Sequence, residues 1–127
     1  MAMTTQAMRA RYAADAVGTA SPARLLTMLY DRLVRDLALA EAAIDAGDVP
    51  AAHRELVHAQ EIVDMLRASL DVEAWDGGPG LAQLYSFLHQ ELVAANVAKD
   101  AGRVAGCRQI IEPLRDAWHQ AAQEAAR

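Results

Sequence analysis

Basic residues, cysteines and aromatic residues are all scarce in this chain of 127 residues. Its 12 lysines and arginines are outnumbered by 17 aspartates and glutamates, so the net charge is -5. No basic stripe is present that could neutralise phosphates, which excludes nucleic acid as a partner. Cys107 is the only cysteine, so an intrachain disulfide and a cysteine metal site are excluded, and a reducing cytosol is favoured.

Long apolar runs are also missing. No stretch approaches the roughly 18 consecutive apolar residues that a membrane span needs. The first residues, 1–15, carry Arg9 and Arg11 but lack the apolar centre of a signal peptide. We therefore expect no membrane association and a cytosolic location.

Helix-forming residues, in contrast, are abundant. Apolar residues make up 54% of the chain, alanine is the commonest residue, and aromatic residues contribute only 5%. The 7 glycines and 4 prolines are few, and the clusters of β-branched and aromatic residues that mark strands are absent. This composition favours one all-α domain with a sizeable core.

Four helices follow from the spacing of apolar residues at intervals of three and four. Ser21 before Pro22 is typical of a helix start, and Gly47 of the residue after a helix end. The expected helices span 22–46, 48 or 50 to 70, 81 to a break near residue 100, and from there to residue 124. The Gly- and Pro-rich stretch 73–80 is expected to be the one longer connection.

Helices of this length joined by mostly short loops predict an antiparallel four-helix bundle over residues 21–124. Residues 1–20 precede it as an N-terminal arm or a short extra helix. Pro113 lies inside the last helix, where it removes one backbone donor, so we expect a kink there.

The second and third helices carry more apolar residues than one buried face needs. Ile62, Met65, Phe87 and Ala94 fall to one side of the main stripes, and we interpret them as the lining of a groove on the outside of the bundle. The alternative is that they widen a core covered by residues 1–17. The two interpretations are compatible, because an arm that covers a groove can also leave it.

Catalytic and metal-binding patterns are poor, so we expect no enzyme activity, no cofactor and no metal. Glu55 to His58 and Asp116 to His119 echo the Glu-x-x-His pairs of di-iron bundles. Both pairs point away from the apolar stripes. Binding a metal inside the bundle would therefore require the helices to rotate and expose their apolar faces to solvent. All four histidines are interpreted as solvated, and Cys107 as a small buried apolar residue.

Specific segments resemble the flagellar secretion chaperone FliS family. The resemblance begins with Tyr12 and Val17 and includes the Thr-Ala-Ser-Pro helix start and the Met-Leu-Tyr-Asp that follows it. It continues through three later segments, 59–63, 84–96 and 114–118. Arg32, Pro113 and the loop 75–80 depart from the pattern of the family.

The resemblance implies a non-enzymatic four-helix bundle that works as a cytosolic export chaperone. Such a protein binds the C-terminal segment of flagellin, prevents its premature polymerisation and delivers it to the flagellar type III export apparatus. The groove of Ile62, Met65, Phe87 and Ala94 would receive that segment. Tyr12 and Val17 would belong to a gating arm that competes for the groove.

A second hypothesis from another class is a helical structural adaptor, in which the same apolar surface closes a homodimer. Sequence alone leaves both open.

Overall fold

The fold is an all-α bundle, as the composition predicts. The computed structural model describes residues 21–125, and these contain four helices and no strand. The helices are α2 (Pro22–Asp45), α3 (Val49–Ser69), α4 (Gly78–Ala98) and α5 (Ala101–Ala125). The expected arm, residues 1–20, lies outside the described residues. Within the described part no helix combines the length and the apolar character that a membrane crossing requires.

Side-chain caps fix where three of the helices begin. Ser21 Oγ accepts a hydrogen bond from the amide of Arg24 at 3.1 Å, and Asp48 Oδ1 accepts one from Ala51 at 3.1 Å. At α5 the carboxylate of Asp100 accepts a bond from the amide of Gly102 at 2.9 Å. Each cap satisfies an amide that the first helical turn leaves unpaired. Of the two predicted starts for the second helix, the one at Asp48 is confirmed.

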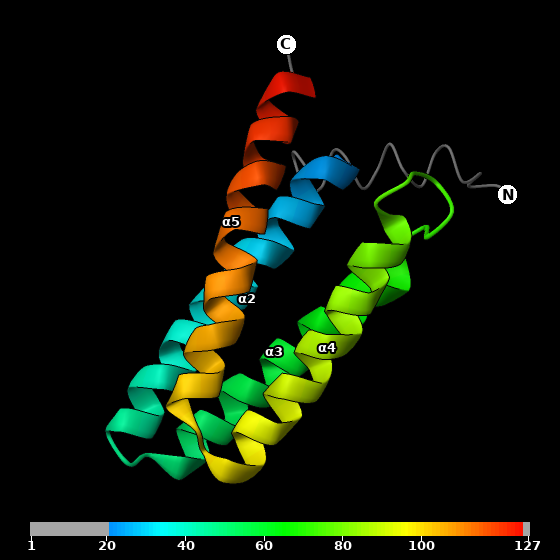
Figure 1. The fold of residues 1–127 in the computed structure, drawn as a ribbon. Coiled ribbons are helices and arrows are strands. Elements are labelled where there is room, and N and C mark those ends of the chain that lie inside the picture. Colours follow the sequence, from blue (N-terminus) through cyan, green and yellow to red (C-terminus); the bar gives the residue numbers. More distant parts are fainter. Residues whose placement is uncertain (1–20, 126–127) are drawn as a thin grey trace, which may run out of the picture.

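Two tight turns make neighbouring helices antiparallel at one end of the bundle. Gly47, with φ 74°, lies in the turn between α2 and α3, and Lys99, with φ 51°, lies in the turn between α4 and α5. Around the bundle α2 contacts α3 and α5, while α4 contacts α3 and α5, so α2 and α4 are diagonal. Figure 1 shows that the pair α2/α5 and the pair α3/α4 diverge toward the opposite end, where Ser21 begins α2 and the loop 70–77 joins α3 to α4.

The buried core follows the predicted stripes with two additions, Tyr30 and Ile62. Ile62 is 1% exposed and packs inside the bundle, so its assignment to an outer groove is wrong. It lies one turn after His58, on the side of α3 that faces α2, where the two helices close over it. The other buried apolar residues are Tyr30, Leu33, Leu37, Ala40, Ala52, Leu56, Ala59, Val63, Leu66, Tyr85, Leu88, Leu92, Ala95, Val104, Cys107 and Ile111.

Two tyrosines form a polar contact across the diagonal of this core. The hydroxyls of Tyr30 on α2 and Tyr85 on α4 lie 2.6 Å apart, and both side chains are at most 1% exposed. Burial raises the pKa of both hydroxyls above the ordinary value of 10.0, so both stay protonated at neutral pH. Trp118 on α5 packs beside them, with its ring centroid 6.4 Å from that of Tyr30.

This pair predicts a specific pattern of mutant stabilities. Tyr30→Phe or Tyr85→Phe should each destabilise the fold by about 1–2 kcal/mol, because the remaining hydroxyl is left buried without its partner. The double variant should be less destabilised than the sum of the two, since it leaves neither hydroxyl. Urea unfolding of all four proteins tests this. Additive losses would show that the hydroxyls do not depend on each other.

A buried carboxylate links α2 to α3. Asp36 is fully buried, and it accepts a hydrogen bond from Nε of Arg32 at 3.0 Å and pairs with Nδ1 of His58. His58, interpreted as solvated, is 37% exposed and also pairs with this carboxylate, because a buried acid needs a partner from the facing helix. Arg32, a departure from the family pattern, supplies a second partner while staying half exposed.

The remaining histidines are exposed or partly exposed, and each lies beside a polar residue of a neighbouring helix. His53 pairs with Asn96, His89 with Asp64 and His119 with Asp31.

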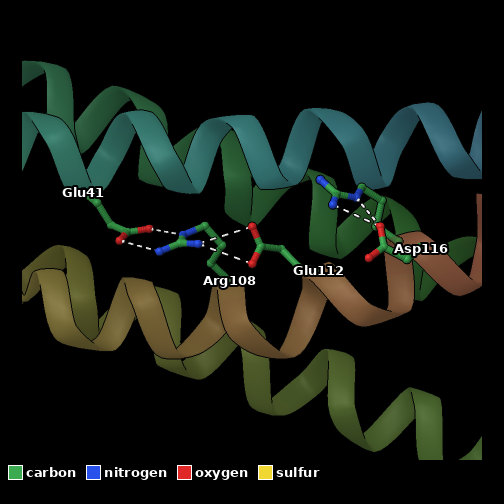
Figure 2. Close-up of polar contacts among 5 residues, drawn as sticks. Glu41, Arg108, Glu112 and Asp116 are labelled. Carbon is green, nitrogen blue, oxygen red and sulfur yellow. Dashed lines mark hydrogen bonds and ion pairs between the residues drawn. The ribbon is translucent and has the colours of Figure 1, made fainter.

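An ion-pair cluster fastens α5 to α2. Arg108 donates from Nε to Glu41 at 2.5 Å and from Nη2 at 3.1 Å, and its Nη1 lies 3.3 Å from Glu112 (Figure 2). The bonds to Glu41 raise the pKa of the Arg108 guanidinium further above its already high value. Such two-point arginine contacts fix geometry as well as charge.

α5 is a single helix from Ala101 to Ala125 with Pro113 exposed inside it, so the kink expected there stays a prediction.

The start of α4 differs from the expectation, because the helix begins at Gly78, inside the stretch taken for a loop. A side chain at this position cannot fit. A Cβ on Gly78 would lie 2.1 Å from the carbonyl oxygen of Val72, so the loop 70–77 folds directly against the helix backbone.

Two alanine substitutions, two positions apart at the start of α4, test this contact. Gly78→Ala should destabilise the protein by about 1–3 kcal/mol, since the loop backbone must move. Gly80→Ala is the matched control, because a Cβ there meets nothing within 4 Å, and it should stabilise α4 by up to about 1 kcal/mol. Thermal unfolding of both variants decides the matter, and equal effects would refute the contact.

Candidate functional site

The seam between α4 and α5 is the least extensively packed of the four helix contacts in the described bundle. The part of this seam next to the tight turn between α4 and α5 is hollowed into a groove of about 540 Å³, which we call the seam groove. Its lining residues are Phe87, Glu91, Asp100, Gly102, Arg103, Gly106, Cys107 and Ile110. Phe87 is 48% exposed, so a large aromatic ring stands open to solvent on its wall.

Two glycines one turn apart leave part of one groove wall without side chains. A Cβ on Gly106 would meet nothing within 4 Å, and one on Gly102 would meet only the carboxylate of Asp100 at 3.2 Å. A glycine inside a helix costs about 1 kcal/mol relative to alanine, and packing within the described bundle does not require it at Gly106. The backbone of α5 is thus open to close approach by another chain.

Charged residues form the rim at the closed end of the seam. Nη1 of Arg103 donates to both carboxylate oxygens of Glu91, at 3.1 and 3.0 Å, and its Nε lies 3.6 Å from Asp100. The pair crosses from α5 to α4 near the tight turn. It links the two helices beside the seam groove.

Half-buried apolar side chains continue the seam toward the diverging end of the bundle. They are Leu81 and Leu84 on α4, and Ile110, Leu114 and Trp118 on α5. At that end lies a second hollow of about 170 Å³, the end pocket. Its apolar lining consists of Leu26, Leu66, Leu70, Ala74, Trp75, Leu81, Tyr85 and Trp118. Groove and pocket together give the α4/α5 side an apolar path along most of its length.

One polar atom in the end pocket is poorly paired. Nε1 of Trp118 is buried and makes no hydrogen bond of good geometry among residues 21–125, although it lies near the hydroxyl of Tyr30, whose pKa it acts to lower. A buried indole N–H without an acceptor is unfavourable, and a carbonyl oxygen of an incoming chain would satisfy it.

The site offers no reactive group. Burial raises the pKa of the Cys107 thiol from 9.0 to about 11, so the thiol is neutral and unreactive at physiological pH. No group of three or more potential metal-ligating His, Cys, Asp or Glu residues occurs among the described residues. The arrangement suits binding of an apolar chain rather than chemistry.

The residues predicted for a groove are separated by the fold. Phe87 lies in the seam groove, and Ala94, two turns later on α4, is half-buried on the same side. Met65 is 48% exposed as expected, but it lies two turns after His58, on the side of α3 that faces α2. The structure therefore does not bring Met65 next to Phe87. Tyr12 and Val17 lie outside the described residues.

Sequence reasoning missed the α5 wall of the site. Ile110 lies beside the predicted stripe, and Gly102 and Gly106 were not considered. The signal was the spacing of these two glycines by four residues within a helix, which exposes backbone along one face. Trp75 was assigned only to a loop, although the loop folds back to line the end pocket.

Comparison with known proteins identifies the family. Residues 4–125 match the family described as "Flagellar protein FliS". The chain belongs to the FliS family. The Bacillus subtilis (strain 168) "Flagellar secretion chaperone FliS" is 31% identical over 112 residues, which cover 88% of this chain and 84% of that protein. The Salmonella typhimurium protein of the same name is 33% identical over 116 residues, with the same coverage of 88% and 84%.

A solved crystal structure of a flagellar chaperone from bacteria shares the fold, with a TM-score of 0.75 at 16% identity. The match between the two structures covers 95% of this chain and 99% of the solved chain. FliS proteins are chaperones, a non-enzymatic class, and membership of the family confirms that this protein is not an enzyme. The seam groove and the end pocket are therefore considered as binding surfaces.

Proposed function

We propose that this FliS protein is a cytosolic export chaperone that receives the C-terminal segment of flagellin along the α4/α5 seam. The observation that carries the proposal is the exposed Phe87 above a wall of bare helix backbone at Gly102 and Gly106. The proposal keeps Phe87 and Ala94 from the predicted lining. It leaves out Ile62, which is in the core, and Met65, which faces α2.

The chemistry of the seam fits a disordered amphipathic segment. Such a segment folds as it binds, covers a long apolar path and loses conformational entropy in doing so, so its affinity per unit area is modest. A segment seated in the seam would cover Phe87, Ile110 and Leu114, and it could offer a carbonyl to Trp118 Nε1. Covering the segment would keep it from polymerising.

Modest affinity also suits delivery. A client held by apolar contacts and a few polar bonds can dissociate without ATP when a receiver competes for the same side chains. The proposed receiver is the flagellar type III export apparatus.

Filling or emptying the groove should change client binding in a predictable way. Phe87→Ala removes the exposed ring and should weaken binding of the flagellin C-terminal peptide about tenfold or more, as expected for an aromatic anchor. Gly106→Leu should abolish binding by occupying the groove, while the fold remains intact because a Cβ there meets nothing within 4 Å. Isothermal titration calorimetry with the peptide encoded in the same genome measures both.

Met65→Ala is the matched control, because Met65 and Phe87 are both 48% exposed but only Phe87 lines the groove. Equal losses for the two alanine variants would contradict the placement of the client. A folded protein that does not bind the peptide at tens of micromolar would contradict the function itself. A tight dimer that the peptide does not dissociate, measured by sedimentation, would favour the homodimeric adaptor instead.

We further propose that Tyr12 and Val17 belong to an arm that competes for this path. Support comes from the position of Ser21, since the chain enters α2 at the end of the bundle that holds the end pocket, which Leu26 helps to line. The four steps along the chain from Val17 to Ser21 can span about 13 Å when extended, enough to reach across that end.

Removing the competitor should therefore tighten client binding. Deletion of residues 1–17 should lower the apparent Kd for the peptide about threefold or more. The apparent Kd equals the intrinsic Kd divided by the fraction of molecules whose site is uncovered, and the deletion raises that fraction. The full-length double variant Tyr12→Ser/Val17→Ser should show the same direction and serves as the control for truncation. Unchanged or weaker binding would make the arm passive or part of the site.

A further inference from the structure

The outward face of α2 differs from the rest of the surface in its charge. Between residues 21 and 125, every arginine except Arg24 and Arg35 has a carboxylate oxygen within 2.5–3.4 Å. These two residues, both exposed on α2, have no ion pair within the described part of the chain. Asp31, between them on α2, is 48% exposed and pairs with His119, so on this side of a protein with a net charge of -5 the two arginines outnumber one exposed carboxylate.

The same face is apolar. Leu25, Met28 and Leu39 are 49%, 50% and 43% exposed, and helical periodicity places them between and beside the two arginines. Together with the half-exposed Arg32 they form what we call the α2 outer face: Arg24, Leu25, Met28, Arg32, Arg35 and Leu39. From Arg24 to Leu39 the face is about 22 Å long.

The α2 outer face is separate from the seam. α2 packs along α3 and α5 and reaches α4, its diagonal neighbour, only through the buried Tyr30–Tyr85 pair, so its free side points away from Phe87. Exposed apolar side chains flanked by unpaired charge are typical of a protein interface rather than of an idle surface.

We infer that the α2 outer face docks an acidic amphipathic helix of another protein. Arg24 and Arg35 are eleven positions apart, which is about three turns, so they lie on one side of α2 roughly 16 Å apart. A partner helix with two carboxylates at the same spacing and apolar residues between them matches both the charges and the exposed side chains. This inference does not depend on the seam or on its client.

Other occupants fit the charges less well. Residues 1–20 of this chain contain Arg9 and Arg11 but only one acidic residue, Asp15, so their side chains carry net positive charge. A second copy related by twofold symmetry would set arginines against arginines. Anionic membranes bind clusters of about four to eight basic residues, whereas this face has two unpaired ones on an acidic protein.

The test uses the full-length chain and a designed helical peptide of about 20 residues, with glutamates eleven positions apart and leucines on the same side. Fluorescence anisotropy should show binding that weakens with added salt. Arg35→Glu should weaken it about fivefold and Arg24→Glu/Arg35→Glu more than tenfold, since reversal turns attraction into repulsion.

Arg54→Glu is the matched control, because it changes the net charge as much as Arg35→Glu but lies on α3, with a side chain that is 70% exposed. It should leave binding unchanged. A peptide with lysines in place of the glutamates should not bind. The inference is overturned if the full-length chain does not bind the acidic peptide, if both peptides bind equally, or if Arg54→Glu weakens binding as much as Arg35→Glu. Binding of phosphatidylglycerol vesicles in place of the peptide, lost in Arg35→Glu, would assign the face to lipid instead.

Discussion

The hydrogen bond between Tyr30 and Tyr85 sets the width of the bundle at its diverging end. Two tyrosine side chains reach from diagonal helices and meet at their hydroxyls, 2.6 Å apart, in a core made mostly of leucine, valine, isoleucine and alanine. Because each hydroxyl is buried, neither can move away without losing its partner, so α2 and α4 are held at a fixed separation. The small residues Ala40, Ala52 and Ala95 lie closer to the tight turns, where the helices can approach each other more closely.

Unequal packing around the four helices follows from this arrangement. α5 is tied to α2 through Arg108 and Glu41, and Trp118 packs against Tyr30, so α5 follows α2 rather than α4. The α4/α5 seam is left with half-buried Leu84, Ile110 and Leu114 in place of a closed core. The apolar path of the proposed site is thus a consequence of which pairs of helices the core holds together.

Much of this fold could be predicted from the sequence, because the signals are local. The Ser21 cap, the Asp48 cap and the spacing of apolar residues at three and four each act within a few residues, and they correctly predict the type and order of the four helices within residues 21–125. The start of α4 at Gly78 could not be predicted in this way, since it depends on the contact with Val72 in a folded-back loop. The same limit applies to His58, whose partner Asp36 lies on another helix.

The candidate site shows a sharper limit. A helical wheel orders residues around one helix, but it cannot tell which neighbour each side faces. The pattern therefore allows Ile62 and Met65 to lie in the core or in the groove, and it distinguishes only Phe87 as partly exposed. The bond between His58 and Asp36 turns the Ile62 and Met65 side of α3 toward α2, where Ile62 is enclosed and Met65 remains at the edge. Phe87 instead faces α5, whose glycines leave room beside it. Surface exposure in this bundle is therefore decided by pairs of helices, and an exposed apolar residue indicates a site only when the facing helix leaves space for another chain.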